Sequence, residues 1–199
     1  MARILTLSGS PSATSRTTRL LGAAAHRLEA RGHQVTALEV RRLPAEVLTG
    51  SDVTHPAVTE VADLLQRVDG VVVGTPVYKA AYSGLLKCLL DLLPQYALAG
   101  RTVLPLATGG SPAHVLAVDY ALRPVLSAMG AAHVTQGWFV LDSHILTTPD
   151  GAVDLAPAAA TALDEVVGRF ADALPAAPEG ELLGAPGVPH PAAVATAAR

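Results

Sequence analysis

Aromatic side chains, cysteine and positive charge are all scarce in this sequence. Its 199 residues include four tyrosines, two phenylalanines and one tryptophan. The single cysteine, Cys88, cannot form a disulfide within the chain, which favours a reducing compartment, and we interpret it as a small buried hydrophobic residue. The formal net charge is −3 and no basic cluster is present, whereas nucleic-acid binding needs a concentrated positive face. We therefore expect no nucleic-acid partner.

Long apolar stretches are also missing. The first residues, MARILTLSGS, lack the extended apolar run of a signal peptide, and no segment is apolar over the length of a membrane span. These features predict a soluble, cytoplasmic protein without a membrane partner. The seven histidines show no metal-ligand spacing supported by a cysteine or carboxylate, so we expect no metal site and no catalytic histidine.

Short apolar runs alternate with longer amphipathic segments along most of the chain. We predict strands at residues 3–7, 34–39, 70–74, 102–108 and 133–140, and helices at 17–30, 56–68, 83–93, 115–129 and 157–173. Five such strand–helix units predict an α/β fold with a parallel sheet and helices on both faces. Gly32 is a left-handed cap candidate. Pro105 cannot donate to a sheet ladder, so we expect a bulge there or a nitrogen that faces an edge.

The composition changes near Leu174. Residues 174–199 are rich in Ala, Pro and Gly, with little to bury and many helix breakers. We therefore divide the chain into one folded domain, residues 1–173, and a tail, residues 174–199, that is disordered or draped on a partner.

Hydroxyl side chains are concentrated in the loop that follows the first predicted strand, SGSPSATSRTT. Hydroxyls and free amides at a helix N-terminus, with Arg16 nearby, are typical of an anion site. The loop matches neither G-x-G-x-x-G nor G-x-x-x-x-G-K-[ST], which favours a phosphate monoester over a pyrophosphate or a nucleoside triphosphate. The alternative is an ordinary N-capping turn, although one cap needs fewer hydroxyls. The hydroxyl-bearing residues are Ser8, Ser10, Ser12, Thr14, Ser15, Thr17 and Thr18.

Two further loops follow the third and fourth predicted strands. They read GTPVYKAAYSG and TGGSPAH, and in the second the pair Gly109 and Gly110 allows a close approach of backbone to a ligand. Because the carboxyl ends of parallel strands share one edge of a sheet, we expect all three loops to meet there.

Together the segments GSP…SRT, TPVYKAAYSGLLKCLLDLLP and LPLATGGSPAHVLAVDYALRP resemble the NADPH-dependent FMN reductases. They are most similar to the flavin reductase components of two-component alkanesulfonate monooxygenase systems. The resemblance covers residues 3 to 143, and the rest of the chain departs from it.

The resemblance implies a flavodoxin-like, doubly wound sheet of five parallel strands in the order 2-1-3-4-5. It implies FMN, as a substrate or a loosely bound cofactor, and NADPH, with NADH possible as the donor. The FMN phosphate would be held by Ser8, Ser10, Ser15, Arg16 and Thr17. The flavin ring would lie beside Thr75, Pro76, Val77 and Tyr78, with Thr108, Gly109 and Gly110 on its far side and His114 adjacent.

The predicted helix at 115–129 contains Pro124, which removes the hydrogen bond to the carbonyl of Tyr120. The result is either a simple kink or a π-bulge, a feature that often marks functional sites. Relatives with the DYAL pattern are similar in having a tyrosine in an irregular helix near the flavin and a subunit boundary. The resemblance therefore implies a role for Tyr120 in flavin exchange, with no acid or base catalyst.

The helix at 83–93 is apolar around much of its circumference. One stripe contains Ala81, Leu85, Cys88, Leu89 and Leu92, and a second contains Leu86, Leu90 and Leu93. Such a helix lies either deep in the core or at a subunit interface. The family pattern implies a homo-oligomer, a tetramer built as a dimer of dimers.

The resulting hypothesis is an NAD(P)H:FMN oxidoreductase that supplies reduced FMN to a partner monooxygenase, as in the metabolism of sulfonates. One alternative is an enzyme that keeps FMN bound and reduces a quinone or azo compound. Another is a flavodoxin-like electron carrier, although carriers usually clamp flavin between aromatics. A phosphoacceptor signalling domain would need acidic residues where Ser8 and Gly74 stand.

Overall fold

The structure, a computed structural model, describes residues 1–147 and 153–175. The strands of its main sheet are β1 (Arg3–Ser8), β2 (Gln34–Glu39), β3 (Gly70–Tyr78), β4 (Ala81–Tyr82), β5 (Thr102–Gly109), β6 (His133–Val134) and β7 (Trp138–Leu141). The main helices are α1 (Arg16–Ala30), α2 (Ala45–Gly50), α3 (Pro56–Gln66), α4 (Gly84–Leu92), α5 (Arg123–Ala128) and α6 (Pro157–Asp172). A separate two-stranded ribbon pairs β8 (Ile145–Thr147) with β9 (Val153–Leu155).

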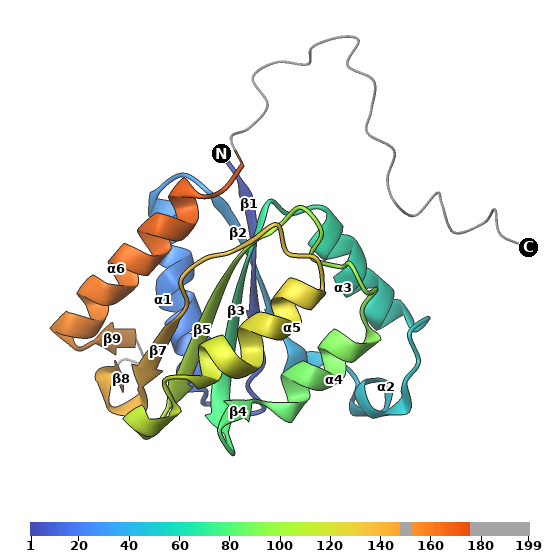
Figure 1. Ribbon diagram of the computed structural model, residues 1–199, viewed down its shortest axis with the longest axis horizontal. Helices are drawn as coiled ribbons and strands as arrows, with labels where there is room; N and C mark the ends of the chain where they lie inside the picture. The colour runs from blue at the N-terminus through green and yellow to red at the C-terminus, as the bar shows by residue number, and fades with distance from the viewer. Residues whose placement is uncertain (148–152, 176–199) are drawn as a thin grey trace, which may run out of the picture.

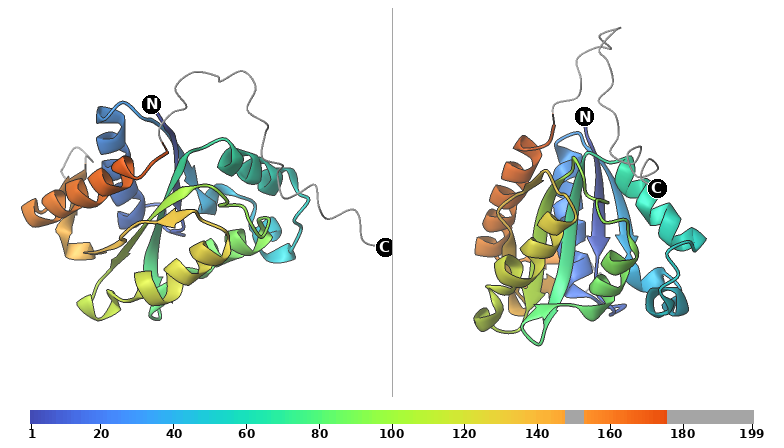
Figure 2. Two further views of the ribbon diagram at one scale, coloured as in Figure 1. Left: turned by 45° about the horizontal axis from the view of Figure 1, so that its top comes forward. Right: turned by 45° about the vertical axis from the view of Figure 1, so that its right-hand side comes forward.

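The central sheet is parallel and has the order β2-β1-β3-β5-β6, with β7 also paired to β5. Because β6 and β7 are two pieces of the fifth predicted strand, this is the expected order 2-1-3-4-5 of a flavodoxin-like sheet. Helices α1 and α6 cover one face and α3, α4 and α5 cover the other, as Figure 1 and both views of Figure 2 show. The fold prediction is confirmed.

Successive strand residues face opposite sides, so the sheet divides the core into two layers. Ile4, Val72 and Leu104 pack against α1 and α6, whereas Leu5 and Val71 pack against the helices of the other face. On α4, the buried side chains Leu86, Leu89, Leu90 and Leu92 belong to this second layer. The deep-core alternative therefore accounts for most of this helix, and Ala81 lies in β4, outside it.

Pro105 interrupts the outer strand without a bulge. The register of β5 against β3 is continuous through Val73 and Pro105. The Val103 carbonyl accepts from the Thr135 amide (2.9 Å), so the backbone groups of Val103 point to the outer strand. The backbone nitrogen of Pro105, two residues further along β5, points the same way. There the pairing stops after β6 and resumes at β7. The predicted strand 133–140 is thus split, because Pro105 cannot donate to it.

The third strand is longer than predicted. Pairing of β3 continues beyond Gly74 to Pro76, opposite Thr108, and the strand ends at Tyr78. A two-residue turn, Lys79 (φ 51°) and Ala80 (φ 64°), then reverses the chain into β4. The segment 75–78 was predicted as a loop, and that prediction is wrong because pairing with β5 extends the strand.

The predicted helix 115–129 is not continuous. This range contains a π-helix, η3 (Val118–Leu122), followed by α5, and a 3₁₀ turn, η2 (Pro112–His114), comes before it. The Arg123 amide donates to the Val118 carbonyl five residues back. Of the two alternatives at Pro124, the π-bulge is therefore the correct one.

Helices α1, α3, α4 and α6 agree with their predicted ranges to within two residues at each end, whereas α2 was not predicted. Gly32 has the left-handed φ of 83° expected of a cap. Apart from Leu174 and Pro175, the predicted tail lies outside the described residues. Within the described ranges, none of the helices combines the length and hydrophobicity needed to cross a membrane.

Candidate active site

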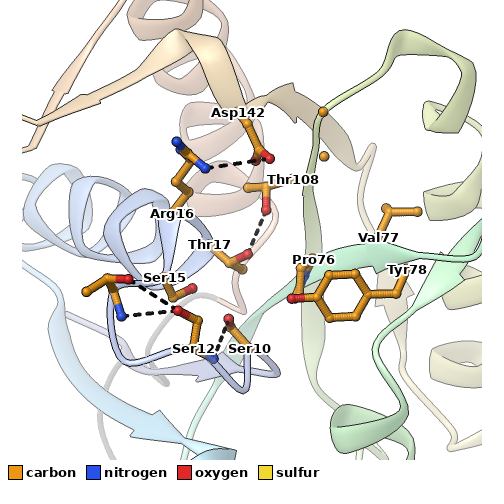
Figure 3. Close-up of a pocket in the computed structure, with 13 residues that line it drawn as sticks. Ser10, Ser12, Ser15, Arg16, Thr17, Pro76, Val77, Tyr78, Thr108 and Asp142 are labelled. Atoms are coloured by element: carbon orange, nitrogen blue, oxygen red, sulfur yellow. Dashed lines mark hydrogen bonds and ion pairs between the residues drawn. The ribbon is translucent and has the colours of Figure 1, made fainter.

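A cavity of about 340 Å³ opens at the carboxyl edge of the sheet. Its size is within the range of small-molecule sites. The lining residues come from the loop before α1, from the ends of β3 and β5, and from the segment after β7, and Figure 3 shows them around one space. They are Ser10, Ser12, Thr14, Ser15, Arg16, Thr17, Pro76, Val77, Tyr78, Thr108, Gly109, Gly110 and Asp142.

One end of the cavity is polar because it is built on the N-terminus of α1. Ser15 is the N-cap of this helix, and its hydroxyl accepts from the Thr18 amide (3.0 Å). Ahead of it, the Ser12 amide donates to the Ser10 hydroxyl (3.3 Å), which holds the loop compact. The positive end of the helix dipole and the Arg16 guanidinium therefore point to an anion.

The opposite wall is the end of β3. Pro76 and Val77 are buried, and the ring of Tyr78, which is 51% exposed, lies across the cavity from the Ser10–Thr17 loop (Figure 3). Thr75 supports this wall from behind: its hydroxyl donates to the Pro76 carbonyl (3.0 Å) and accepts from the Ser83 amide (2.9 Å). This wall can contact a flat, largely apolar group.

The end of β5 closes the cavity on a third side. A Cβ atom at Gly109 would come within 3.0 Å of the Phe139 ring, whereas at Gly110 it would meet nothing within 4 Å. Glycine at 109 therefore permits the packing of β7 against β5, and glycine at 110 leaves the backbone accessible. The Thr108 and Thr17 hydroxyls, both buried, lie 2.6 Å apart and join the two sides of the site.

A carboxylate also lies in this polar end. Asp142, just after β7, has its Oδ2 atom 3.9 Å from the Arg16 Nη1 atom. Both side chains are partly exposed, by 34% for Asp142 and 55% for Arg16. Figure 3 shows the two side chains turned toward each other above Thr17.

Most of the predicted flavin-binding residues line this one cavity: Ser10, Ser15, Arg16, Thr17, Pro76, Val77, Tyr78, Thr108, Gly109 and Gly110. Three others do not. Ser8 is buried, with its hydroxyl 2.8 Å from that of Thr18, Thr75 supports the β3 wall, and the Nδ1 atom of His114 is buried with no hydrogen-bond partner. Tyr120 is 77% exposed and outside the cavity lining of this single chain.

Three further residues line the cavity. Ser12 and Thr14 were expected among the hydroxyls of the anion loop, although the set of phosphate-binding residues implied by the resemblance did not include them, and Asp142 was not predicted at all. Asp142 could have been found from its position directly after the fifth predicted strand, at the same sheet edge. Among the described residues, no group of three or more His, Cys, Asp and Glu side chains is placed to hold a metal ion.

These donors fit the phosphate and ring of a flavin mononucleotide. Helix amides, hydroxyls and one guanidinium suit a phosphate monoester, and the end of β3 suits an apolar ring. A sheet of order 2-1-3-4-5 with such a loop after its first strand defines a flavodoxin-like, mononucleotide-binding class of protein.

The model of the NADPH-dependent FMN reductase family matches residues 2–145, and the chain belongs to this family. It is similar to an FMN reductase (NADPH) of Pseudomonas putida, with 50% identity over 142 residues, 71% of this chain and 72% of the relative. A protein of the same description from Escherichia coli is 49% identical over 144 residues, 72% of this chain and 75% of the relative. The crystal structure of apo NADH:FMN oxidoreductase (EMOB) is 41% identical, with a TM-score of 0.80, and covers 89% of this chain and 92% of that one.

Proposed function

We propose that this protein reduces free FMN with NADPH or NADH and hands the reduced flavin to a flavin-dependent monooxygenase, as in sulfonate metabolism. The observation that supports it is the single cavity that joins a phosphate-type anion site at α1 to the apolar end of β3. The bound flavin would supply the hydride-accepting chemistry, and the chain would bind it, orient it and shield it from water.

The residues divide by their proposed contacts into those that hold the phosphate, those that contact the ring, and those that support these from behind. Ser10, Ser15, Arg16 and Thr17 hold the phosphate, and Pro76, Val77 and Tyr78 contact one side of the ring. On the far side, Thr108, Gly109 and Gly110 present backbone groups. Ser8 and Thr75 act behind this surface, by supporting Thr18 and the β3 wall.

A site that passes its flavin on must release it. Among the described residues that line the cavity, Tyr78 is the one aromatic side chain, and about half of its surface is exposed. An electron carrier that encloses its flavin between aromatic rings would have more of them here. The sparse aromatic lining therefore favours flavin as an exchangeable substrate.

The assembly we propose is a homotetramer. Val115 and Leu116 are 50% and 55% exposed, and both are close in sequence to the still more exposed Tyr120. Clustered exposed apolar side chains of this size are typical of protein interfaces. A second subunit on this face would place Tyr120 at a subunit boundary near β4, which contacts η3.

The test is a comparison of NADPH and NADH oxidation with and without added FMN, on protein whose flavin content has been measured after gel filtration. We expect protein that is largely flavin-free and oxidation that depends on added FMN. Addition of a flavin-dependent sulfonate monooxygenase should then couple nicotinamide oxidation to sulfite release. Retained flavin with quinone reduction in the absence of free FMN would instead establish the quinone reductase alternative.

A further inference from the structure

Asp142 places a negative charge inside a site built for an anion. Its carboxylate lines the polar end of the cavity together with Ser10, Ser15 and Arg16, and it extends from the segment after β7 toward the Arg16 guanidinium (Figure 3). In the part of the chain that the structure describes, the side-chain hydrogen bonds that hold the loop before α1 do not involve Asp142. A neutral side chain at this position would leave those contacts unchanged.

The carboxylate could act on a flavin phosphate in two opposite ways. It could align Arg16 and so strengthen binding, or it could repel the phosphate and compete for the same guanidinium. The separation of 3.9 Å and the exposure of both side chains make alignment weak, because exposed ion pairs of this kind hold their partners loosely. Repulsion would act on a larger charge, because the phosphate of a mononucleotide has close to two negative charges at neutral pH.

We propose that Asp142 weakens the binding of the flavin phosphate and thereby keeps FMN exchangeable. It would do so by repelling the phosphate directly and by competing with it for the Arg16 guanidinium. This inference rests on the proposed function, specifically on the flavin phosphate lying at the N-terminus of α1. The sparse aromatic lining would loosen binding at the ring end of the flavin, and Asp142 would loosen it at the phosphate end.

The experiment titrates flavin-free protein with FMN and with riboflavin, which lacks the phosphate, and follows the quenching of flavin fluorescence. Asp142→Asn should bind FMN about three- to tenfold more tightly than the parent at low ionic strength, and riboflavin equally well. The gain should shrink at about 0.5 M salt, since salt screens exposed charges. Asp142→Ser serves as a second neutral variant with a shorter side chain.

Asp63→Asn is the matched control. Asp63 also lies 3.9 Å from an arginine, Arg67, in an exposed pair, but on α3 and outside this cavity. The substitution Asp63→Asn therefore changes the net charge by the same amount as Asp142→Asn, and it should leave the affinities for FMN and riboflavin unchanged. A general charge effect, in which Asp63→Asn tightens FMN as much as Asp142→Asn, would overturn the proposal.

Two other results would also overturn it. FMN affinity that is unchanged or weaker in Asp142→Asn would mean that alignment of Arg16 dominates, and equal tightening of riboflavin would mean that the phosphate is not involved. Arg16→Ala separates this failure from a failure of the proposed site. If Arg16→Ala weakens FMN selectively and Asp142→Asn has no effect, the phosphate site stands and only the role of Asp142 falls.

Discussion

Arg16 supplies the positive charge in the cavity lining, and we expect its contribution to FMN binding to come from this charge. We expect Arg16→Ala to weaken FMN binding about tenfold to a hundredfold, because a charge-assisted contact contributes about 1.5–3 kcal/mol. Half of the side chain is solvent-exposed, which favours the lower end of this range. Riboflavin affinity should change little. Fluorescence titrations with both flavins measure the difference.

Arg16→Lys is the control for this prediction, because lysine keeps the charge and loses the forked geometry. It should recover part of the FMN affinity. Equal losses of FMN and riboflavin in Arg16→Ala would show that Arg16 supports the loop and does not contact the phosphate.

Glu39, at the end of β2, gives a pH-dependent contribution to stability. Burial raises the pKa of this carboxyl. The hydrogen bonds from Arg41 (2.7 Å) and Arg42 (2.8 Å), together with the charges of these two side chains, lower the pKa by more than burial raises it, so the net shift is downward. A lowered pKa in the folded state adds stability above the unfolded pKa, and this stability is lost as pH falls through the folded pKa.

Glu39→Gln should therefore lower the free energy of unfolding by about 1 kcal/mol at pH 7. The difference between variant and parent should shrink as the pH is lowered through the acid range, because the native carboxyl then also takes up its proton. Urea unfolding at neutral and at acid pH tests this. Glu60→Gln, on the exposed surface of α3, is the control, and a difference independent of pH would contradict the assignment.

At the scale of elements, the interruption between β6 and β7 depends on Gly137. A Cβ atom at this position would clash with the Val118 side chain of the π-helix and would approach the Pro105 carbonyl oxygen to 2.8 Å. Gly137→Ala should destabilise the fold by about 1–3 kcal/mol, since backbone must move to admit it. Thermal unfolding measures the loss.

Gly22→Ala is the contrasting substitution. Gly22 lies inside α1, and an added Cβ atom would meet nothing within 4 Å. It should raise stability by about 0.5–1 kcal/mol, because alanine loses less backbone entropy in a helix. If Gly137→Ala were as well tolerated as Gly22→Ala, the outer strand would not depend on the close approach that the structure shows.

The sequence pattern correctly predicted the elements whose conformation depends on their own residues. It failed where pairing with a neighbouring strand determines the conformation. The helix α1 and the strand β1 were found to within one residue. The extension of β3 was missed because Thr75 and Pro76 favour a loop, whereas pairing of Pro76 with Thr108 keeps the chain extended. In the same way, the gap after β6 arises from Pro105, on another strand. Asp142 was missed although it follows the fifth predicted strand at the same sheet edge, and what the sequence did not show was that it would lie beside Arg16.

The π-helix is the element that we connect to flavin exchange. Pro124 showed from sequence that the Tyr120 carbonyl would lose its α-helical partner, but not whether the helix would kink or widen. Deletion of Tyr120 removes the extra residue and should let η3 continue as α-helix into α5. FMN should then stay bound through gel filtration, and turnover with excess FMN should fall.

Tyr120→Ala separates the side chain from the helix register. Because Tyr120 is 77% exposed, its truncation should change thermal stability little, so a change in flavin retention would reflect the site. The measurements are the flavin-to-protein ratio and the turnover number. Variants that elute flavin-free and turn over like the parent would refute the role we propose for Tyr120.

At the scale of the whole molecule, four sheet-edge segments that are far apart in sequence form one site. Parallel strands made three of them predictable, since their carboxyl ends must share an edge. The same geometry leaves the face around η3 uncovered in a single chain. Val115, Leu116 and Tyr120 are large, apolar and at least half exposed there, next to the β4 hairpin that follows Tyr78.

We expect light scattering at micromolar concentration to give about four times the 20.3 kDa chain mass. Leu116→Lys, combined with Val115→Lys, should shift the protein to smaller species, because two charges would be buried without partners at the contact. Circular dichroism should stay unchanged, since both side chains are half exposed in the single chain. Val53→Lys is the control: Val53 is 54% exposed but lies beside α3 and the end of α4, so the assembly should persist. A monomer mass for the parent would remove the proposed assembly, and a double variant that keeps the parent mass would place the contact on another face.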